Sequence, residues 1–245
     1  MSIFLNKKIL IYGSGRSGLS TLEFLRNKSD VFLYDDFKKN LKNSISNKLI
    51  LKKQFDFIII SPGIDINKCK LSQFLKKNLK KIYTDLDVFY SFYKNDCISI
   101  TGTNGKSTTC QLLYEILSKH KYDDKLVGNI GKPILSAKNI KSKTIFVIEA
   151  SSYQLEYSQI FKSKYAAILN ISPDHLDRHK TVSNYVKTKF KIFKNNSKNS
   201  LGFINKKDFL TIKELKRQKL RRKILKVNTR SVNDIQEKID NEYFL

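Results

Sequence analysis

Residues 101–108 read T-G-T-N-G-K-S-T; they follow the apolar, strand-like run 97–100 and lead into a helix-like run that extends to residue 117. Glycine lets the backbone approach phosphate oxygens, and the first amides of a helix point toward a bound anion. In such a loop Lys106 supplies a compact positive charge and the Ser107 hydroxyl can bind Mg2+. The segment therefore predicts a nucleotide phosphate site, with ATP as the first ligand to consider.

The loop departs from the usual Walker pattern in one respect. G-x-x-x-x-G-K-S would need glycine at the position of Ile100, so this loop is shorter and contains only Gly102 and Gly105. Taken alone, the segment also fits a glycine turn that caps a helix and carries a surface lysine.

Glycine and proline are scarce in this chain of 245 residues, which has nine glycines and three prolines. Eight of the glycines fall in the segments 13–18, 61–63, 102–105 and 128–131, which marks these as places where backbone geometry matters. The length allows two domains of ordinary size, each with its own core.

Residues 1–93 are expected to form a small Rossmann-like α/β domain. Compact apolar runs predict its strands at 8–12, 31–34 and 55–60, and amphipathic runs predict helices at 17–25, 71–79 and 85–93.

Residues 94–245 are expected to form a second α/β domain of the P-loop type. Its expected strands are 97–100, 144–148, 166–170 and 201–204, and its expected helices are 107–117, 153–160 and 182–193. This alternation predicts mostly parallel sheets, which bind ligands at the carboxyl ends of their strands. Five residues fall at such ends: Gly13, Ser61, Gly102, Glu149 and Asn170.

The formal charge of +25 raises the possibility of nucleic-acid binding. Seven of the 47 basic residues are arginine, and the lysines are spread through nearly every segment. The densest patch, residues 213–223, has no aromatic residue on which bases could stack, so a solvated helix face is the preferred explanation. We expect no nucleic-acid partner.

No apolar run reaches membrane-spanning length, and the three cysteines have no disulfide or metal-ligand spacing. We expect a cytoplasmic protein without a membrane partner.

Residues 13–18 read G-S-G-R-S-G between a predicted strand and a predicted helix, and Asp35 ends the next strand. This context matches the dinucleotide fingerprint, whose tight turn and acidic acceptor could serve any nucleotide diphosphate. Plain helix-strand packing is the alternative.

Two further strand ends carry ionisable side chains. Glu149 could hold Mg2+ against phosphate oxygens, or could cap the following helix. The segment 172–178 places Asp174, His175 and Asp177 together at the next strand end, where the alternative is ordinary loop polarity.

Lys189 falls on the apolar stripe of the helix expected at 182–193. A lysine there must snorkel, pair with an acid or lose its charge. Snorkelling is the simplest outcome on periodicity alone.

Several motifs together resemble those of the Mur ligases, a family of ATP-dependent amide ligases. They are the loop at 102–108, which folylpolyglutamate synthases share, and the more specific G-N-I-G at 128–131, E-A-S-S-Y-Q-L-E at 149–156 and I-L-N-I-S-P-D-H-L-D-R at 168–178. The family members that add D-glutamate have S-S-[FY]-Q-L-E after a metal-binding acid. Their N-terminal motifs G-x-G-x-x-G-L-S and S-P-G-I also recur, at 13–20 and 61–64.

The resemblance implies an ATP site and two Mg2+ ions. Lys106 would act on the transferred phosphoryl group, Ser107 and Glu149 would hold one Mg2+, and His175 would ligate the second. Lys189 resembles the family lysine that reacts with CO2 to give a carbamate, which acts through the second metal. The residues implied to hold ATP are Gly102, Thr103, Asn104, Gly105, Lys106, Ser107 and Thr108.

The resemblance also implies a substrate path across both domains. Arg16, Ser17, Asp35 and Gly63 would meet the uridine diphosphate end, and Asn129 and Gln154 would lie nearer the muramoyl part. The implied reaction joins D-glutamate to UDP-N-acetylmuramoyl-L-alanine in cytoplasmic peptidoglycan precursor synthesis, through an acyl phosphate. A monomer is expected.

Members of the family carry three domains, and the third contributes to amino-acid binding and completes the ATP site. Here the resemblance is strong over residues 9–193 and weak after residue 201. We therefore expect the central domain to be incomplete, the C-terminal ligase domain to be absent, and these 245 residues alone to have little or no ligase activity.

Three other functions remain open from the sequence. Another amide ligase, such as a folylpolyglutamate synthase, would not need the nucleotide-diphosphate turn at 13–18. A noncatalytic nucleotide-binding remnant would bind ATP without forming an amide, and a nucleic-acid binder would show steep salt dependence.

Overall fold

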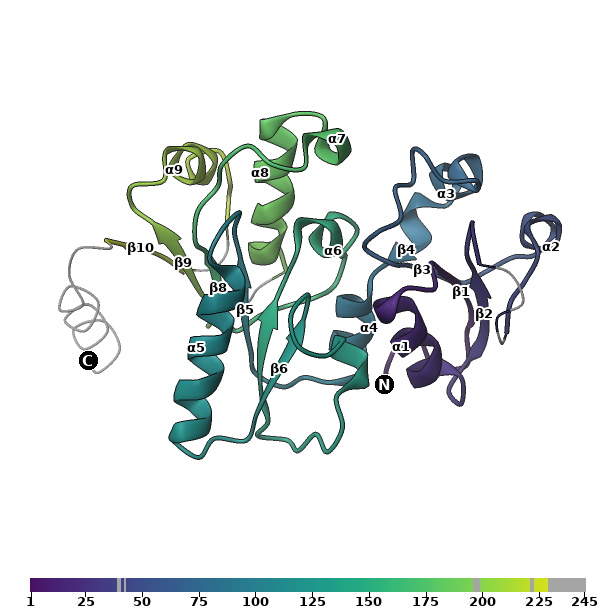
Figure 1. The fold of residues 1–245 in the computed structure, drawn as a ribbon, viewed down its shortest axis with the longest axis horizontal. Coiled ribbons are helices and arrows are strands. Elements are labelled where there is room, and N and C mark those ends of the chain that lie inside the picture. The colour runs from purple at the N-terminus through teal and green to yellow at the C-terminus, as the bar shows by residue number, and fades with distance from the viewer. Residues whose placement is uncertain (39–40, 42, 196–198, 221–222, 229–245) are drawn as a thin grey trace.

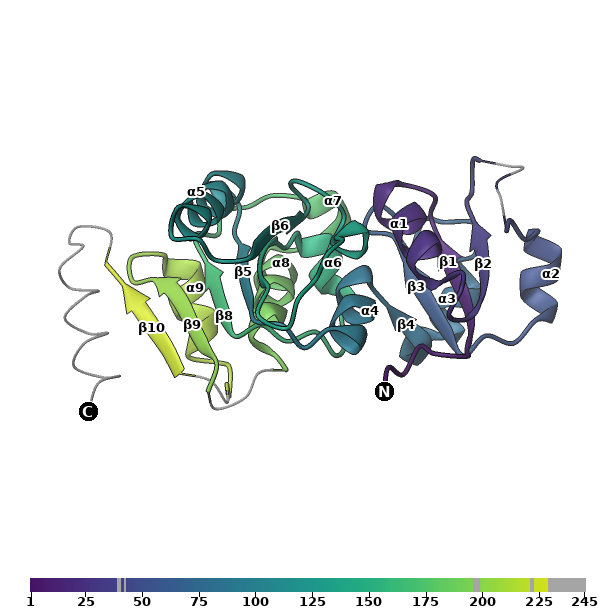
Figure 2. The same ribbon diagram turned by 90° about the horizontal axis from the view of Figure 1, so that it is seen from below.

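The computed structural model describes residues 1–38, 41, 43–195, 199–220 and 223–228. Its strands form two parallel sheets that lie side by side, with helix α4 (Asp85–Phe92) between them (Figures 1 and 2). The predicted α/β class is confirmed.

The first sheet has the strand order β2-β1-β3-β4, all parallel. Its strands are β1 (Lys8–Tyr12), β2 (Asp30–Tyr34), β3 (Phe57–Ile60) and β4 (Ile82–Tyr83). The helices in this part are α1 (Arg16–Leu25), α2 (Asn47–Lys52), α3 (Ser72–Lys77) and the 3-10 turn η1 (Leu79–Lys81).

Strand β1 is central because both of its faces can be buried. Leu10 and Tyr12 pack with α2 and α3 residues on one face, whereas Ile9 and Ile11 join a core on the other face that reaches the second sheet. The chain leaves β1 for β2 on one side and later returns to β3 on the other, so the carboxyl ends of β1 and β3 form a topological switch point. There the Ser61 hydroxyl donates to the Gly13 carbonyl oxygen at 2.9 Å.

The second sheet has the order β10-β9-β8-β5-β7-β6, again parallel. Its strands are β5 (Cys97–Thr101), β6 (Asp124–Gly128), β7 (Ile145–Glu149), β8 (Tyr165–Ile168), β9 (Leu201–Asn205) and β10 (Lys223–Val227). The helices are α5 (Lys106–Lys119), α6 (Ser152–Glu156), α7 (Leu176–His179), α8 (Val182–Phe190) and α9 (Phe209–Leu215), with 3-10 turns η2 (Ile134–Ser136) and η3 (Lys191–Phe193).

Helices cover both faces of this sheet. Cys110 of α5 packs against Ile100 and Val147 on one face. Phe146 and Ile148 face the opposite way, into the core that contains Tyr185, Val186 and Phe190 of α8. The strand ends around β5 are thereby left as the open edge where side chains can meet a ligand.

Helix α6 ends earlier than expected, at Glu156 rather than residue 160. The reason is a competing acceptor. Asp87 Oδ1 accepts hydrogen bonds from the backbone amides of Gln159, Ile160 and Phe161 at 2.8–3.0 Å, so these amides do not continue the helix.

The sequence also missed β6 and β10. Strand β6 is an edge strand in which only Val127 is buried, so its sequence D-K-L-V-G lacks the apolar run of a central strand. The helix face expected across residues 213–223 is wrong after Leu215, because residues 216–220 are not helical and Lys223 begins β10, which pairs with β9.

Candidate active site

The loop between β5 and α5 has the backbone of a phosphate cradle. Gly102 has φ +157° and Gly105 has φ +79°, and Gly105 forms the N-cap of the 14-residue helix α5 without a side-chain cap. These positive φ values favour glycine. The uncapped N-terminus of a long helix favours an anion in front of it.

Lys106 lies in the first turn of α5, where its ammonium group donates to the Thr103 carbonyl oxygen at 2.7 Å. The Lys106 side chain thus folds back over the phosphate loop. A phosphate oxygen in the loop would compete with this carbonyl for the same ammonium group.

Glu149 ends β7 and is 1% exposed. Its Oε2 accepts from the Ser107 hydroxyl at 2.8 Å, and its Oε1 accepts from the Asn129 side-chain amide at 2.8 Å. The structure therefore brings together the two residues that the sequence assigned to one Mg2+. A carboxylate and a hydroxyl are the hard oxygen donors that Mg2+ prefers.

Among the described residues, no three His, Cys, Asp or Glu side chains are grouped closely enough to form a metal site by themselves. A donor pair such as Ser107 and Glu149 fits an ion that keeps water and phosphate oxygens as its other ligands, which is the usual habit of Mg2+.

Lys189 is 2% exposed, on the buried face of α8. Its ammonium group donates to the Gly102 carbonyl oxygen at 2.7 Å and lies 4.6 Å from the centre of the Tyr185 ring. Burial, together with the positive charge of Lys106, lowers the pKa of Lys189 to about 7, although Asp174 opposes this shift. The lysine is therefore neutral in a substantial fraction of molecules near pH 7 and does not snorkel to water.

His175 has φ +51° and stands at the start of α7. Its ring lies between those of Tyr153 and Tyr185, at 5.0 and 6.3 Å between centroids, and its Nε2 is 3.4 Å from Asp174 Oδ2. The Tyr185 hydroxyl lies 3.3 Å from the Thr103 hydroxyl. Tyr185 thus contacts His175, Lys189 and the phosphate loop at once.

On the first sheet, Asp35 holds the glycine turn that follows β1. Its Oδ2 accepts from the Ser14 amide and hydroxyl, both at 2.7 Å, and its Oδ1 accepts from the amides of Phe37 and Lys38. Burial alone would raise the pKa of Asp35, but these hydrogen bonds lower it to about 2. The carboxylate also lines a hollow of about 420 Å³ beside β2.

Two further predicted substrate residues follow strands of the first sheet: Arg16 begins the helix after β1, and Gly63 lies in the loop after β3. The exposed Arg16 side chain donates to the Gly131 carbonyl oxygen at 2.8 Å, which links the glycine turn of the first sheet to the G-N-I-G loop of the second. Gly63 is exposed, and among the described residues no atom beyond its two chain neighbours lies within 4 Å of a Cβ built on it.

The Gln154 side chain is buried, whereas a side chain that contacts a ligand is expected to be accessible. It is 2% exposed, and its side-chain amide lies 3.3 and 3.4 Å from the two oxygens of Asp85. Burial raises the pKa of Asp85, and hydrogen bonds from Gln154 and Ser17 act in the opposite direction. The muramoyl contact of Gln154 stays a prediction.

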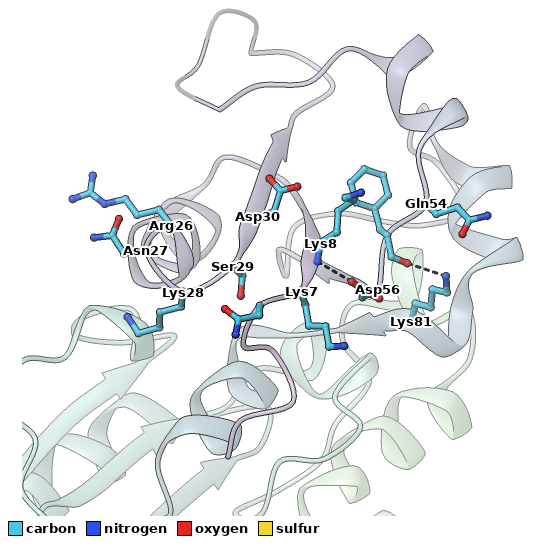
Figure 3. A pocket seen from close by; sticks show the side chains of 12 residues that line it. Lys7, Lys8, Arg26, Asn27, Lys28, Ser29, Asp30, Gln54, Asp56 and Lys81 are labelled. Carbon is cyan, nitrogen blue, oxygen red and sulfur yellow. Dashed lines mark hydrogen bonds between the residues drawn. The ribbon is translucent and has the colours of Figure 1, made fainter.

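Another hollow, of about 760 Å³, lies at the opposite, amino-terminal edge of the first sheet (Figure 3). Lys81 donates there to the Phe55 carbonyl oxygen, and the Lys8 amide donates to Asp56. None of the residues predicted from the sequence as site residues lines this hollow.

Comparison with known proteins shows where this arrangement belongs. The model of the Mur ligase middle domain matches residues 100–244. The chain belongs to the Mur ligase family.

Curated Mur ligases extend the match into the first sheet. The UDP-N-acetylmuramoylalanine-D-glutamate ligase of Rickettsia felis is 40% identical over 215 residues, which cover 84% of this chain and 47% of the relative. The protein of that name from Lachnoclostridium phytofermentans is 36% identical over 222 residues, which cover 84% of this chain and 49% of the relative. The chain therefore spans about half the length of the curated relatives that it matches.

Solved Mur ligase structures share the fold. The UDP-N-acetylmuramate:L-alanyl-γ-D-glutamyl-meso-diaminopimelate ligase from Neisseria meningitides aligns with 90% of this chain and 78% of its own, with a TM-score of 0.57 at 15% identity. A murein peptide ligase from Psychrobacter arcticus aligns with 90% of this chain and 53% of its own, with a TM-score of 0.53 at 15% identity.

Sequence reasoning missed two residues that organise this Mur ligase site. Tyr185 lies on the apolar stripe of the helix expected at 182–193, which by itself predicts only a core position, and Asn170 is one of five residues at expected strand ends. The tertiary contacts of Tyr185 with Thr103 and of Asn170 with Asn104 reveal their positions. The sequence signal for Asn170 is its place at the end of the strand expected at 166–170; in the structure it lies two residues after β8 and contacts the phosphate loop.

Proposed function

We propose that this chain provides the nucleotide and sugar-nucleotide sites of an ATP-dependent ligase that joins D-glutamate to UDP-N-acetylmuramoyl-L-alanine. The observation that carries the proposal is the convergence of Lys106, Glu149 and Lys189 on the glycine loop after β5. The protein would act in cytoplasmic peptidoglycan precursor synthesis as a monomer.

ATP would lie with its phosphates in the loop at residues 102–108. The amides of the first turn of α5 would face phosphate oxygens, and Lys106 would leave the Thr103 carbonyl to bind the transferred group. Ser107 and Glu149 would hold one Mg2+ ion, and His175 would ligate a second. When bound, these ions neutralise charge that builds up on the phosphoryl oxygens.

The low pKa of Lys189 supports a further modification. A neutral amine can add to the carbon of CO2 and lose a proton, which gives a carbamate with carboxylate-like oxygens. The pKa of about 7 makes that neutral amine available near physiological pH. We propose that Lys189 takes this form and acts through the second metal ion.

UDP-N-acetylmuramoyl-L-alanine would lie across both sheets. Arg16, Ser17, Asp35 and Gly63 would meet the uridine diphosphate end, and Asn129 and Gln154 would lie closer to the muramoyl part. The ordered turn held by Asp35 supports the first assignment, because a fixed turn lets the backbone approach a diphosphate closely.

The proposed reaction has two steps. The alanyl carboxylate of the substrate attacks the γ-phosphorus of ATP, which forms an acyl phosphate and releases ADP. The amine of D-glutamate then attacks the acyl carbon, phosphate leaves with the oxygen to which it was bonded, and the nitrogen releases one proton to water. Lys106 would stabilise the negative charge of the transferred phosphoryl group in the first step.

Binding of MgATP by the purified chain tests the ATP site. Lys106→Met should weaken binding at least tenfold, because it removes the positive charge from the phosphate loop. The control is Lys119→Met, which removes an exposed lysine at the other end of the same helix and should leave the affinity unchanged. Equal affinities for the wild type and Lys106→Met would refute the site.

Amide formation by these 245 residues is a separate question. We expect these 245 residues to bind MgATP but not to release ADP when D-glutamate is added. The relatives that are named as D-glutamate ligases are about twice as long. Substantial ADP release that requires both UDP-N-acetylmuramoyl-L-alanine and D-glutamate would contradict this expectation.

A further inference from the structure

The Asn170 side chain forms a closed pair of hydrogen bonds with the backbone of Asn104 in the phosphate loop. Its Oδ1 accepts from the Asn104 amide at 2.9 Å, and its Nδ2 donates to the Asn104 carbonyl oxygen at 3.0 Å. The backbone of Asn170 adds a third bond, because its carbonyl oxygen accepts from the Thr103 amide at 2.9 Å.

These hydrogen bonds hold the part of the phosphate loop around Asn104, where the flanking glycines restrict the backbone least. Asn104 stands between Gly102 and Gly105, both at positive φ, and glycine loses more conformational freedom on folding than any other residue. The loop also has Ile100 at the position where the Walker pattern places a glycine. A short loop with two glycines needs an external support if its amides are to face one anion.

The same segment connects the loop to the residues after β8. The Thr103 hydroxyl accepts from the Ser172 amide at 3.0 Å and lies 3.2 Å from the Ser172 carbonyl oxygen. Asp174 and His175 follow directly along the chain. A shift of the phosphate loop would therefore disturb the segment that presents His175.

We propose that Asn170 is a positioning residue that holds the phosphate loop in its nucleotide-binding conformation through the backbone of Asn104. The inference rests on the proposed ATP site. It assigns to Asn170 no contact with the nucleotide, so its effect must pass through the order of the loop.

The test compares Asn170→Leu with a matched asparagine elsewhere in the fold. Asn95 is also half-buried, and its side-chain amide donates to the carbonyl oxygens of Lys141 and Thr144 at 2.8 and 3.0 Å, before β5 begins. Asn95→Leu therefore removes comparable bonds at the opposite end of β5. Asn170→Ala serves the same comparison if leucine at residue 170 prevents folding.

Three quantities are measured for the full 245-residue chain: the thermal midpoint, the Kd for MgATP, and the hydrogen-exchange rate of a peptide that spans residues 102–105. Both asparagine variants should lower the midpoint by similar amounts. Only the residue 170 variant should weaken MgATP binding, by about tenfold, which is the order expected for one or two net hydrogen bonds. Only that variant should also speed exchange in the loop.

Two results would overturn the inference while leaving the ATP site intact. One is equal MgATP affinity in the residue 170 and residue 95 variants. The other is a loss of affinity in the residue 170 variant with unchanged exchange in the loop, because loop order would then not be the cause. Failure of the wild-type chain to bind MgATP would remove the proposed site and this inference together.

Discussion

The surroundings of the Lys189 side chain determine its protonation near neutral pH. Tyr185 and the Gly102 carbonyl surround its ammonium group, and Lys106 adds a like charge nearby. No carboxylate of the described residues is hydrogen bonded to it, so the interior disfavours its charged form. The consequence is a basic group that titrates close to neutrality.

The lowered pKa of Lys189 should make the free energy of unfolding depend on pH, and the Lys189→Met variant should lack this dependence. The pKa of Lys189 is about 7 in the folded chain against 10.5 as the ordinary value, so between these pH values the unfolded chain binds a proton that the folded chain does not. The free energy of unfolding therefore rises with pH in this window, by roughly 2 kcal/mol between pH 7.5 and 9 relative to the methionine variant. Urea unfolding in CO2-free buffer measures it.

Lys187→Met is the matched control for this pH dependence, because Lys187 is exposed on the same helix. Its stability should follow that of the wild type at every pH. Parallel curves for the wild type and Lys189→Met would show that the buried amine keeps its charge.

At the scale of elements, the turn from β1 into α1 depends on a close approach between helix and strand end. A Cβ on Gly18 would lie 1.8 Å from the Gly13 carbonyl oxygen and 2.8 Å from the Ser61 hydroxyl oxygen. Gly15 lies three residues earlier in the same motif, and no atom of the described residues beyond its chain neighbours lies within 4 Å of such a Cβ. The two glycines therefore have different physical roles.

Gly18→Ala should lower the free energy of unfolding by at least about 2 kcal/mol, because the added Cβ would clash with backbone atoms that cannot easily move. The cost of this clash exceeds the gain in helix propensity, which is at most about 1 kcal/mol. Gly15→Ala should change it by no more than about 1 kcal/mol, since only an N-cap preference is at stake. Urea unfolding of both variants measures the difference. Equal destabilisation would mean that α1 can move away from β1 at little cost.

Elements with a strong local pattern could be predicted from the sequence. Strands β1, β5 and β7 are mostly buried and rich in apolar residues. The parallel pairing of β5 with β7 brings Gly102 and Glu149 to one edge of the second sheet. Strand β10 and the early end of α6 depend on partners distant in sequence, namely β9 and Asp87. The Asn170–Asn104 pair and the Arg16–Gly131 bond likewise depend on loop conformation, which periodicity does not encode.

At the scale of the whole molecule, the two sheets share one core. The cluster that contains Ile9 and Ile11 of β1 also contains Phe146 and Ile148 of β7, with Phe89 of α4 between them. Asp87, on the same helix, accepts six hydrogen bonds, from the amide and hydroxyl of Thr84, the Ser158 hydroxyl and the amides of residues 159–161. Separating the sheets would expose apolar surface, and moving α4 away with the first sheet would leave the donors of residues 158–161 without their acceptor.

We therefore expect the chain to unfold as a single unit, and a ligand at one sheet to stabilise the other. Within the described part of the chain, no helix is long and apolar enough to cross a membrane. MgATP at a hundred times its Kd should raise the free energy of unfolding by about 2.7 kcal/mol. Hydrogen exchange of the slowest amides in β1 and β7 should slow by the same factor, about a hundredfold, because both exchange through global unfolding. Protection confined to β7, with unchanged exchange in β1, would show that the first sheet opens independently of the nucleotide site.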